Sequence, residues 1–349
     1  MTSGWIRWLT AFALAFVVFG IARTALAEDC PGNPGAIGTS RTIVVDPTEH
    51  PRIGGMSYAE TLPLADKEVV LTFDDGPIEP YSSKILDILA SECVHATYFV
   101  VGDMVRAHPE LVQRELREGH TVGTHSMTHP YAFRRLRFDV AKAQIDDGIA
   151  AASAAVGDPK ALAPFFRFPG FERTDESEDY LAGRGMMVWG ADFPADDWMR
   201  ISDKEIVRRA LMRIQHKGKG ILLLHDIHPA TVRALPMLLK ELKARGYHIV
   251  HVVPASEDRP KTETVAEAWQ VSKRPKLAMP VLTPSDVQNL SVESVAQHFL
   301  ASHLADLCSL KGMTTLASAG QVHPPRFSAA HLGRTRSDRF GHWSWPRWY

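Results

Sequence analysis

The chain reads Lys67-Glu-Val-Val-Leu-Thr-Phe-Asp-Asp-Gly-Pro77 where an apolar run ends in two adjacent acids. Residues 69–73 are mostly β-branched or aromatic, which favours a buried strand. Two carboxylates side by side at the end of such a strand raise each other's pKa, so the pair calls for a nearby cation. Asp-Gly is also typical of an ordinary turn, so a second group of residues has to decide between the two interpretations.

That second group is a pair of histidines, His125 and His129, after another β-rich run at residues 121–124. Histidines four residues apart share a face if the segment turns helical, so both imidazoles can bind one metal ion. The chain has 16 histidines, and one such pair alone is weak evidence. Together with a carboxylate from the first group, the two histidines form the ligand set of an open divalent metal site.

Three more motifs follow in order: Phe166-Arg-Phe-Pro-Gly170, Asp196-Asp-Trp198 and Leu222-Leu-Leu-His-Asp226. With the two segments above, the chain resembles the polysaccharide deacetylase family with the NodB homology domain. All five family motifs occur in the expected order between about residues 67 and 254. The resemblance implies a distorted (β/α) barrel, a divalent metal ion and an activity on acetylated glycans.

The resemblance also implies roles for single residues. Asp75, His125 and His129 match the family's metal ligands. Zinc is the expected ion, although this ligand set also suits cobalt, nickel, manganese or iron. Asp74 matches the catalytic base that takes a proton from the attacking water, and Arg167 matches the cation that pairs with this base.

His225 matches the family's general acid, which protonates the leaving amine. Asp197 matches the acid that orients this histidine. The segment 192–198 holds three acids and is longer than in most relatives, so Asp192 and Asp196 are alternatives for this role.

Substrate contacts are implied at four further positions: Gly170, Phe171, Trp198 and Leu223. The family uses the backbone N–H at position 170 to stabilise the oxyanion, and glycine supplies one as well as the more common aromatic residue does. Trp198 would form a wall of the sugar site, and Leu223 would line the pocket for the acetyl methyl group.

Apolar β runs alternate with helical patterns from residue 68 onward, which indicates parallel β/α units. We expect strands at 69–73, 96–101, 121–124, 164–168, 186–189, 220–224 and 248–253. We expect helices at 81–92, 104–118, 139–154, 177–183, 203–216 and 231–245. Motif residues follow separate strands, which favours a barrel whose strand ends meet at one mouth. The predicted fold is therefore α/β, a distorted barrel with about seven parallel strands.

The rest of the chain divides into flanking segments. Residues 1–27 combine Arg7, an apolar stretch at 9–21 and a small-residue cleavage site before a cut after Ala27, as in a secretory signal. We therefore expect a periplasmic or secreted protein that is not integral to the membrane after cleavage, with an uncleaved anchor as the alternative. Residues 28–66 are predicted to be an irregular lead-in, 67–256 the deacetylase domain, and 257–349 a disordered tail. The arginines and tryptophans near the C-terminus would also suit sugar or anionic surfaces.

Charge and cysteine content narrow the choice of partners and compartment. The formal net charge is −1, and loss of Arg7 and Arg23 with the signal makes it about −3. A charge this close to neutral gives no electrostatic argument for nucleic-acid binding. Three cysteines form no disulfide framework. Cys30 and Cys93 can pair in an oxidising compartment, but Cys93 lies in a core-like sequence, so we expect a buried thiol there.

The sequence thus predicts a metal-dependent hydrolase that removes acetyl groups from glycans containing N-acetylglucosamine, either chitooligosaccharides or a cell-wall glycan, and releases acetate. O-deacetylation of a polysaccharide such as xylan would use the same catalytic groups. An inactive sugar-binding relative is the alternative from a different class. It would be expected to lack the base or the acid, and this chain has both Asp74 and His225. The oligomeric state is not predicted.

Overall fold

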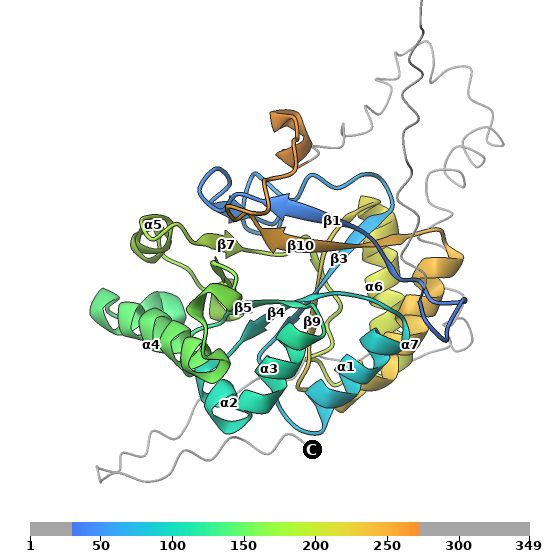
Figure 1. Cartoon of the computed structure of the whole chain (residues 1–349), viewed down its shortest axis with the longest axis horizontal. Helices are drawn as coiled ribbons and strands as arrows, with labels where there is room; N and C mark the ends of the chain where they lie inside the picture. The colour runs from blue at the N-terminus through green and yellow to red at the C-terminus, as the bar shows by residue number, and fades with distance from the viewer. Residues whose placement is uncertain (1–29, 272–349) are drawn as a thin grey trace, which may run out of the picture. The chain divides into compact units, whose positions relative to one another are not determined.

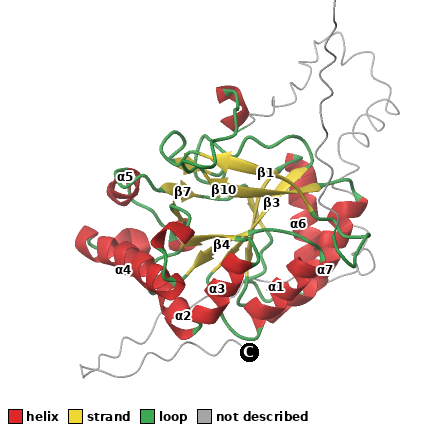
Figure 2. Cartoon of the chain, in the orientation of Figure 1, coloured by secondary structure: helices red, strands yellow, loops and turns green. Residues whose placement is uncertain are grey.

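The computed structural model describes residues 30–271, and parallel strands alternate there with helices (Figures 1 and 2). The strands are β1 Thr39–Val45, β2 Arg52–Ile53, β3 Glu68–Asp74, β4 Thr97–Val100, β5 Thr121–Thr124, β6 Phe165–Phe166, β7 Met187–Trp189, β8 Phe193–Pro194, β9 Gly220–His225 and β10 His248–Pro254. The α-helices are α1 Tyr81–Ser91, α2 Gly102–Ala107, α3 Pro109–Arg117, α4 Phe138–Val156, α5 Asp175–Ala182, α6 Asp203–Lys217 and α7 Pro229–Ala244. Short 3-10 turns are η1 Phe133–Arg135, η2 Pro159–Ala161, η3 Pro169–Phe171 and η4 Ala266–Trp269.

The strands form one sheet in the order β1-β10-β3-β4-β5-β6-β7-β2, and β9 pairs with β3 and β8. Each pairing between these named strands is parallel. The chain passes from β7 into β8, which lies against β9, so the sheet curves back toward β3. The predicted α/β fold with a distorted barrel is confirmed, and the seven predicted strands correspond to β3–β7, β9 and β10.

Alternation along β3 separates two hydrophobic cores. Leu71 and Phe73 pack in a core shared with α1, α6 and α7. Val70 points the other way, into an inner core that includes Trp189. Because successive side chains of a strand face opposite sides, Asp74 has the same orientation as Val70 and reaches the interior of the barrel at the strand's C-terminal end.

The helix predicted over 104–118 consists of two helices, α2 and α3, which are separated by His108. Pro109 is the first residue of α3. Proline disfavours helical backbone in the residue before it and is favoured at the first helical position, so one helix ends and another begins here.

The expectation of an irregular lead-in over residues 28–66 was wrong for two segments. β1 pairs with β10 from Thr39 to Val45, and β2 pairs with β7. These strands add to the edges of a sheet whose main strands come later in the chain, so their pairing depends on distant partners rather than on a local pattern.

The expected domain boundary at residue 256 was also wrong. Trp269 is 3% exposed and belongs to the inner core, and its ring stacks on His50 at 3.5 Å between centroids. Backbone hydrogen bonds join Thr262 to Val44 and Val271 to Ala59. The folded part therefore continues to residue 271 at least. The predicted signal at 1–27 and the tail beyond 271 lie outside the described residues.

Cys30 and Cys93 form a disulfide, so the expectation of a free buried thiol was wrong. Cys93 is only half-buried, because it follows the C-terminal end of α1 in a left-handed backbone conformation (φ 50°). Its neighbour Val94 takes the core position instead. In the described range, none of the helices combines the length and hydrophobicity that crossing a membrane requires.

Candidate active site

The two adjacent acids lie on a tight turn at the end of β3. Asp74 is the last residue of the strand, and Asp75 has left-handed backbone with φ 80°. The Gly76 N–H then donates to Asp226 Oδ1 at 2.9 Å. A Cβ at position 76 would lie 2.0 Å from Asp226 Oδ2, so glycine is required for the close approach of the two segments.

Asp75, His125 and His129 converge as predicted, with one potential ligand atom from each within 4.8 Å of the others. Asp75 Oδ1 lies 3.4 Å from His125 Nε2 and 3.3 Å from His129 Nε2. His125 Nδ1 lies 2.7 Å from the Arg167 carbonyl oxygen. Since a carbonyl only accepts, Nδ1 carries a proton, and Nε2 is the nitrogen that faces Asp75 and is available to bind a metal ion in the neutral ring.

The donor set of these three residues fits a divalent cation. Asp75 Oδ1 is buried and has no hydrogen-bond partner among the described residues, which is costly for a carboxylate without a cation. Burial raises the pKa of Asp75, but its interactions with His125, His225 and His129 outweigh burial and lower it overall. Burial lowers the pKa of His129, which favours the neutral imidazole that binds metals.

Backbone strain also gathers around this group. Asp75, Ser126 and His129 have positive φ values of 80°, 68° and 51° although none of them is glycine. Such conformations persist only where the surrounding structure fixes them, and they are common at functional sites.

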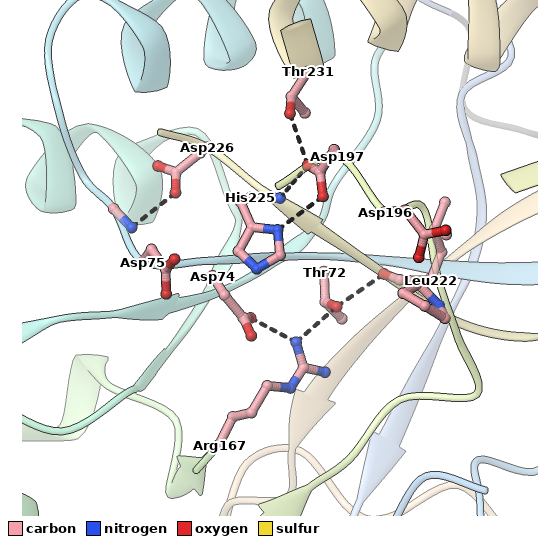
Figure 3. A network of polar contacts seen from close by, with 12 residues as sticks. Thr72, Asp74, Asp75, Arg167, Asp196, Asp197, Leu222, His225, Asp226 and Thr231 are labelled. Atoms are coloured by element: carbon pink, nitrogen blue, oxygen red, sulfur yellow. Dashed lines mark hydrogen bonds and ion pairs between the residues drawn. The ribbon is translucent and has the colours of Figure 1, made fainter. Parts of the chain in front are cut away.

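Arg167 is fully buried and bonds to the base predicted from the sequence (Figure 3). Its Nη1 donates to Asp74 Oδ1 at 2.6 Å and to Thr72 Oγ1 at 2.9 Å, and Nη2 donates to the Gly190 carbonyl at 2.8 Å. The guanidinium also lies over the Phe99 ring, 4.2 Å from its centroid. Burial lowers the pKa of Arg167 and the carboxylate of Asp74 opposes that shift, so a charged pair is held inside the protein.

His225 ends β9 and is held by Asp197, the acid that the family pattern indicated. Asp197 Oδ1 lies 2.8 Å from His225 Nδ1, while Oδ2 accepts from the His225 backbone N–H and from Thr231 Oγ1, both at 2.7 Å. Burial lowers the pKa of His225, but Asp197, with smaller effects of Asp75 and Asp74, outweighs burial and raises it to about 10. This shift favours the imidazolium form of the ring at neutral pH.

The two alternatives to Asp197 lie elsewhere. Asp196 forms ion pairs with Arg209 and Arg213 of α6, both at 2.7 Å. Asp192 accepts from the backbone N–H groups of Gly55 and Ile221 and so fastens the N-terminal segment to β9.

Comparison with known proteins supports the family resemblance seen in the sequence. A family model described as polysaccharide deacetylase matches residues 62–189. A chitooligosaccharide deacetylase of a Bradyrhizobium species is 35% identical over 206 residues, which cover 54% of this chain and 90% of that protein. The chain belongs to the polysaccharide deacetylase family.

Two further similarities lie within the same family. The peptidoglycan-N-acetylglucosamine deacetylase PgdA of Listeria monocytogenes is 33% identical over 187 residues, which are 54% of this chain and 38% of that protein. The matched region thus spans well under half of that relative. The structure of a peptidoglycan deacetylase from Bdellovibrio bacteriovorus superposes with a TM-score of 0.56 at 32% identity, covering 62% of this chain and 60% of that one.

In this member of the polysaccharide deacetylase family, Trp198 contacts the site directly among the four residues predicted to bind substrate. Gly170 and Phe171 have positive φ values of 58° and 57°, which turn the chain sharply after Pro169. Trp198 is 45% exposed and lies edge-on to His225, with 5.4 Å between ring centroids. Leu223 belongs to the inner core and is 5% exposed.

One residue of the site had no role assigned from the sequence. Asp226 is 1% exposed and joins the Gly76 N–H to the Ser82 hydroxyl. Burial, with a smaller contribution from Asp75, raises the pKa of Asp226 to about 7. The sequence did contain a sign of this residue, because Asp226 is an acid next to the end of a predicted buried strand, as Asp74 is.

Proposed function

We propose that the protein is a metal-dependent deacetylase that removes acetyl groups from glycans containing N-acetylglucosamine and releases acetate. The observation that carries the proposal is the pairing of Asp74 with His225 in register on the neighbouring strands β3 and β9. This register puts a candidate base and a candidate acid side by side at the mouth of the barrel, next to the Asp75–His125–His129 group.

Each residue has a defined task in this reaction. A divalent ion held by Asp75, His125 and His129 would lower the pKa of a water molecule and polarise the acetyl carbonyl. Asp74 accepts the proton as the water attacks the carbonyl carbon, and Arg167 stabilises the carboxylate before that transfer. The Gly170 backbone N–H is the proposed donor to the developing oxyanion.

The second half of the reaction belongs to His225. Its Nδ1 faces Asp197, so Nε2 is directed toward Asp74 and Asp75 (Figure 3). His225 donates the Nε2 proton to the amine nitrogen as the carbon–nitrogen bond breaks, which yields acetate and a free amino sugar. Asp197 keeps this acid protonated until that step.

The deciding experiment measures acetate release by the purified chain, loaded with zinc or cobalt, on N-acetylated chitooligosaccharides, peptidoglycan and acetylated xylan. We expect release from at least one N-acetylated substrate and loss of that release in Asp74→Asn. Release from xylan alone would favour the O-deacetylase alternative. Specific sugar binding without any acetate release would make the protein a sugar-binding relative and contradict the proposal.

We also propose that the protein acts in the periplasm or outside the cell. The signal-like segment at 1–27 and the Cys30–Cys93 disulfide support this location, since structural disulfides persist in oxidising compartments. Cell fractionation with N-terminal sequencing tests it. We expect a chain that starts at Glu28 outside the cytosol, and an uncut chain in the cytosol would refute the location.

A further inference from the structure

Two aromatic side chains stand out on the surface of the described residues. Tyr131 is 77% exposed and Trp198 is 45% exposed, whereas the other phenylalanine, tyrosine and tryptophan side chains between residues 30 and 271 are buried or half-buried. Exposed aromatic rings forgo the burial that normally stabilises them, so their position on the surface calls for an explanation.

Both rings contact a histidine of the candidate active site. Tyr131 lies edge-on to His129, with 5.5 Å between centroids and 83° between planes. Trp198 lies edge-on to His225, with 5.4 Å and 74°. The two exposed rings of this part of the chain therefore border one site and come from two different loops, one after β5 and one before α6.

The loop that carries Tyr131 is anchored close behind the ring. Phe133 is 1% exposed and packs edge-on against Phe168 at 5.2 Å. Arg134 pairs with Glu172 at 2.7 Å and so ties this loop to the turn that contains Gly170. The anchoring makes Tyr131 a fixed, outward-facing platform on the His129 side of the site.

A fixed exposed ring is suited to a sugar, because the C–H groups on one face of a pyranose pack against an aromatic face. Tyrosine provides a large aromatic contact area at a low cost in side-chain entropy. Trp198 lies next to His225, where the proposed reaction places the reacting sugar, so a second platform next to His129 would hold a different unit of the same glycan.

The inference rests on the proposed function and deepens it. We propose that Tyr131 binds a sugar unit adjacent to the one being deacetylated and thereby makes the protein prefer chains of several units over disaccharides. Tyr131 would be a residue of substrate specificity, without a part in the proton transfers or in holding the metal.

The test compares Tyr131→Ala and Tyr131→Phe with Met212→Ala, a control at a residue that is 50% exposed on α6. Steady-state kinetics use the N-acetylated chitin disaccharide and tetrasaccharide. We expect Tyr131→Ala to raise KM for the tetrasaccharide by about 3- to 10-fold, with kcat and the disaccharide KM little changed. Tyr131→Phe keeps the ring and should restore the tetrasaccharide KM.

A second readout separates this inference from the proposed activity. Calorimetry measures tetrasaccharide binding to metal-loaded Asp74→Asn, with and without Tyr131→Ala. Tyr131-dependent affinity here, together with no acetate release by the metal-loaded wild-type protein, would sustain the inference and refute the proposed activity. Acetate release with equal tetrasaccharide KM in all variants would refute the inference alone.

Two further outcomes would also overturn the role of Tyr131. Loss of bound metal in Tyr131→Ala would show that the ring supports His129 rather than a sugar. Absence of both binding and hydrolysis in the wild-type protein would refute the inference and the proposed activity together.

Discussion

Asp74 and His225 are register partners on adjacent parallel strands, β3 and β9. Neighbouring strands lie about 4.8 Å apart, so the sheet itself sets the spacing between the proposed base and the proposed acid. Each of the two has its own buried partner of opposite charge, Arg167 for Asp74 and Asp197 for His225. The two proton-transfer groups can therefore keep opposite protonation states at short range.

Loss of the Arg167 charge should destabilise the fold. Arg167→Met leaves Asp74 buried without its cation, which typically costs about 3–5 kcal/mol of unfolding free energy. Urea unfolding of the metal-loaded protein measures this change. Arg137→Ala, which breaks an exposed pair with Asp139, is the control and should change stability by less than about 0.5 kcal/mol. Equal stabilities of the two variants would mean that the buried pair contributes nothing measurable.

Asp74→Asn and Asp75→Asn should differ in metal content. Asp75→Asn removes the one carboxylate of the metal group, so zinc affinity and turnover should fall together. Asp74→Asn should retain about one zinc per chain while turnover falls by orders of magnitude, because only the proton acceptor is lost. Elemental analysis after dialysis, with acetate-release kinetics, makes the comparison. Identical behaviour of the two variants would contradict the division into base and ligand.

The pH profile should report the Asp197–His225 pair. Because Asp197 raises the pKa of His225, the acid stays protonated well above neutral pH, toward about 10. Asp197→Asn removes this effect, so the alkaline limb of the kcat/KM profile should move to lower pH while bound zinc is retained. Asp196→Asn is the matched control, since Asp196 pairs with α6 instead. An unmoved limb in Asp197→Asn would remove Asp197 from the mechanism.

The same pair should make stability depend on pH. The pKa of His225 is higher in the folded than in the unfolded state, so its interaction with Asp197 stabilises the fold. This stabilisation is fully present below the unfolded pKa of about 6.5 and is lost as the pH rises through the folded pKa of about 10. The unfolding free energy of the wild type should therefore fall over that window by more than that of His225→Ala. Parallel curves for the two proteins would contradict the assigned shift.

Trp269→Ala should destabilise the folded part although residue 269 lies in the predicted tail. Removal of a buried tryptophan side chain typically costs about 3–5 kcal/mol. Val265→Ala changes a side chain that is 67% exposed in the same segment and serves as the control. Thermal and urea unfolding compare the two. If Trp269→Ala were as stable as the control, the packing of this segment would not contribute to the fold.

The sequence predicted the elements and the convergence of Asp75, His125 and His129 well because their signals are local. Runs of apolar residues mark β3 and β9, and acids or histidines directly after such strands mark the site. The spacing of the acids left Asp196 as an alternative to Asp197 for the partner of His225. The folded chain decides between them, because Arg209 and Arg213 of α6 pair with Asp196 and leave Asp197 to contact His225.

The features that the sequence missed depend on distant partners. β1 is stabilised as a strand by β10, which lies about two hundred residues later. Trp269 enters the core as part of a single 3-10 turn, too short for a periodic pattern. Pairing of Cys30 with Cys93 requires the end of α1 to lie beside the start of the described chain.

Arg167 contributes to the site through two chemically separate parts. Its carbonyl oxygen orients His125, and its guanidinium binds Asp74. Substitution changes the side chain alone, because every amino acid retains the backbone carbonyl. A mutational scan of position 167 should therefore vary the charge environment of Asp74 while the hydrogen bond that orients His125 stays in place. In those variants that stay folded, this position would therefore separate the proposed proton abstraction from the proposed metal binding.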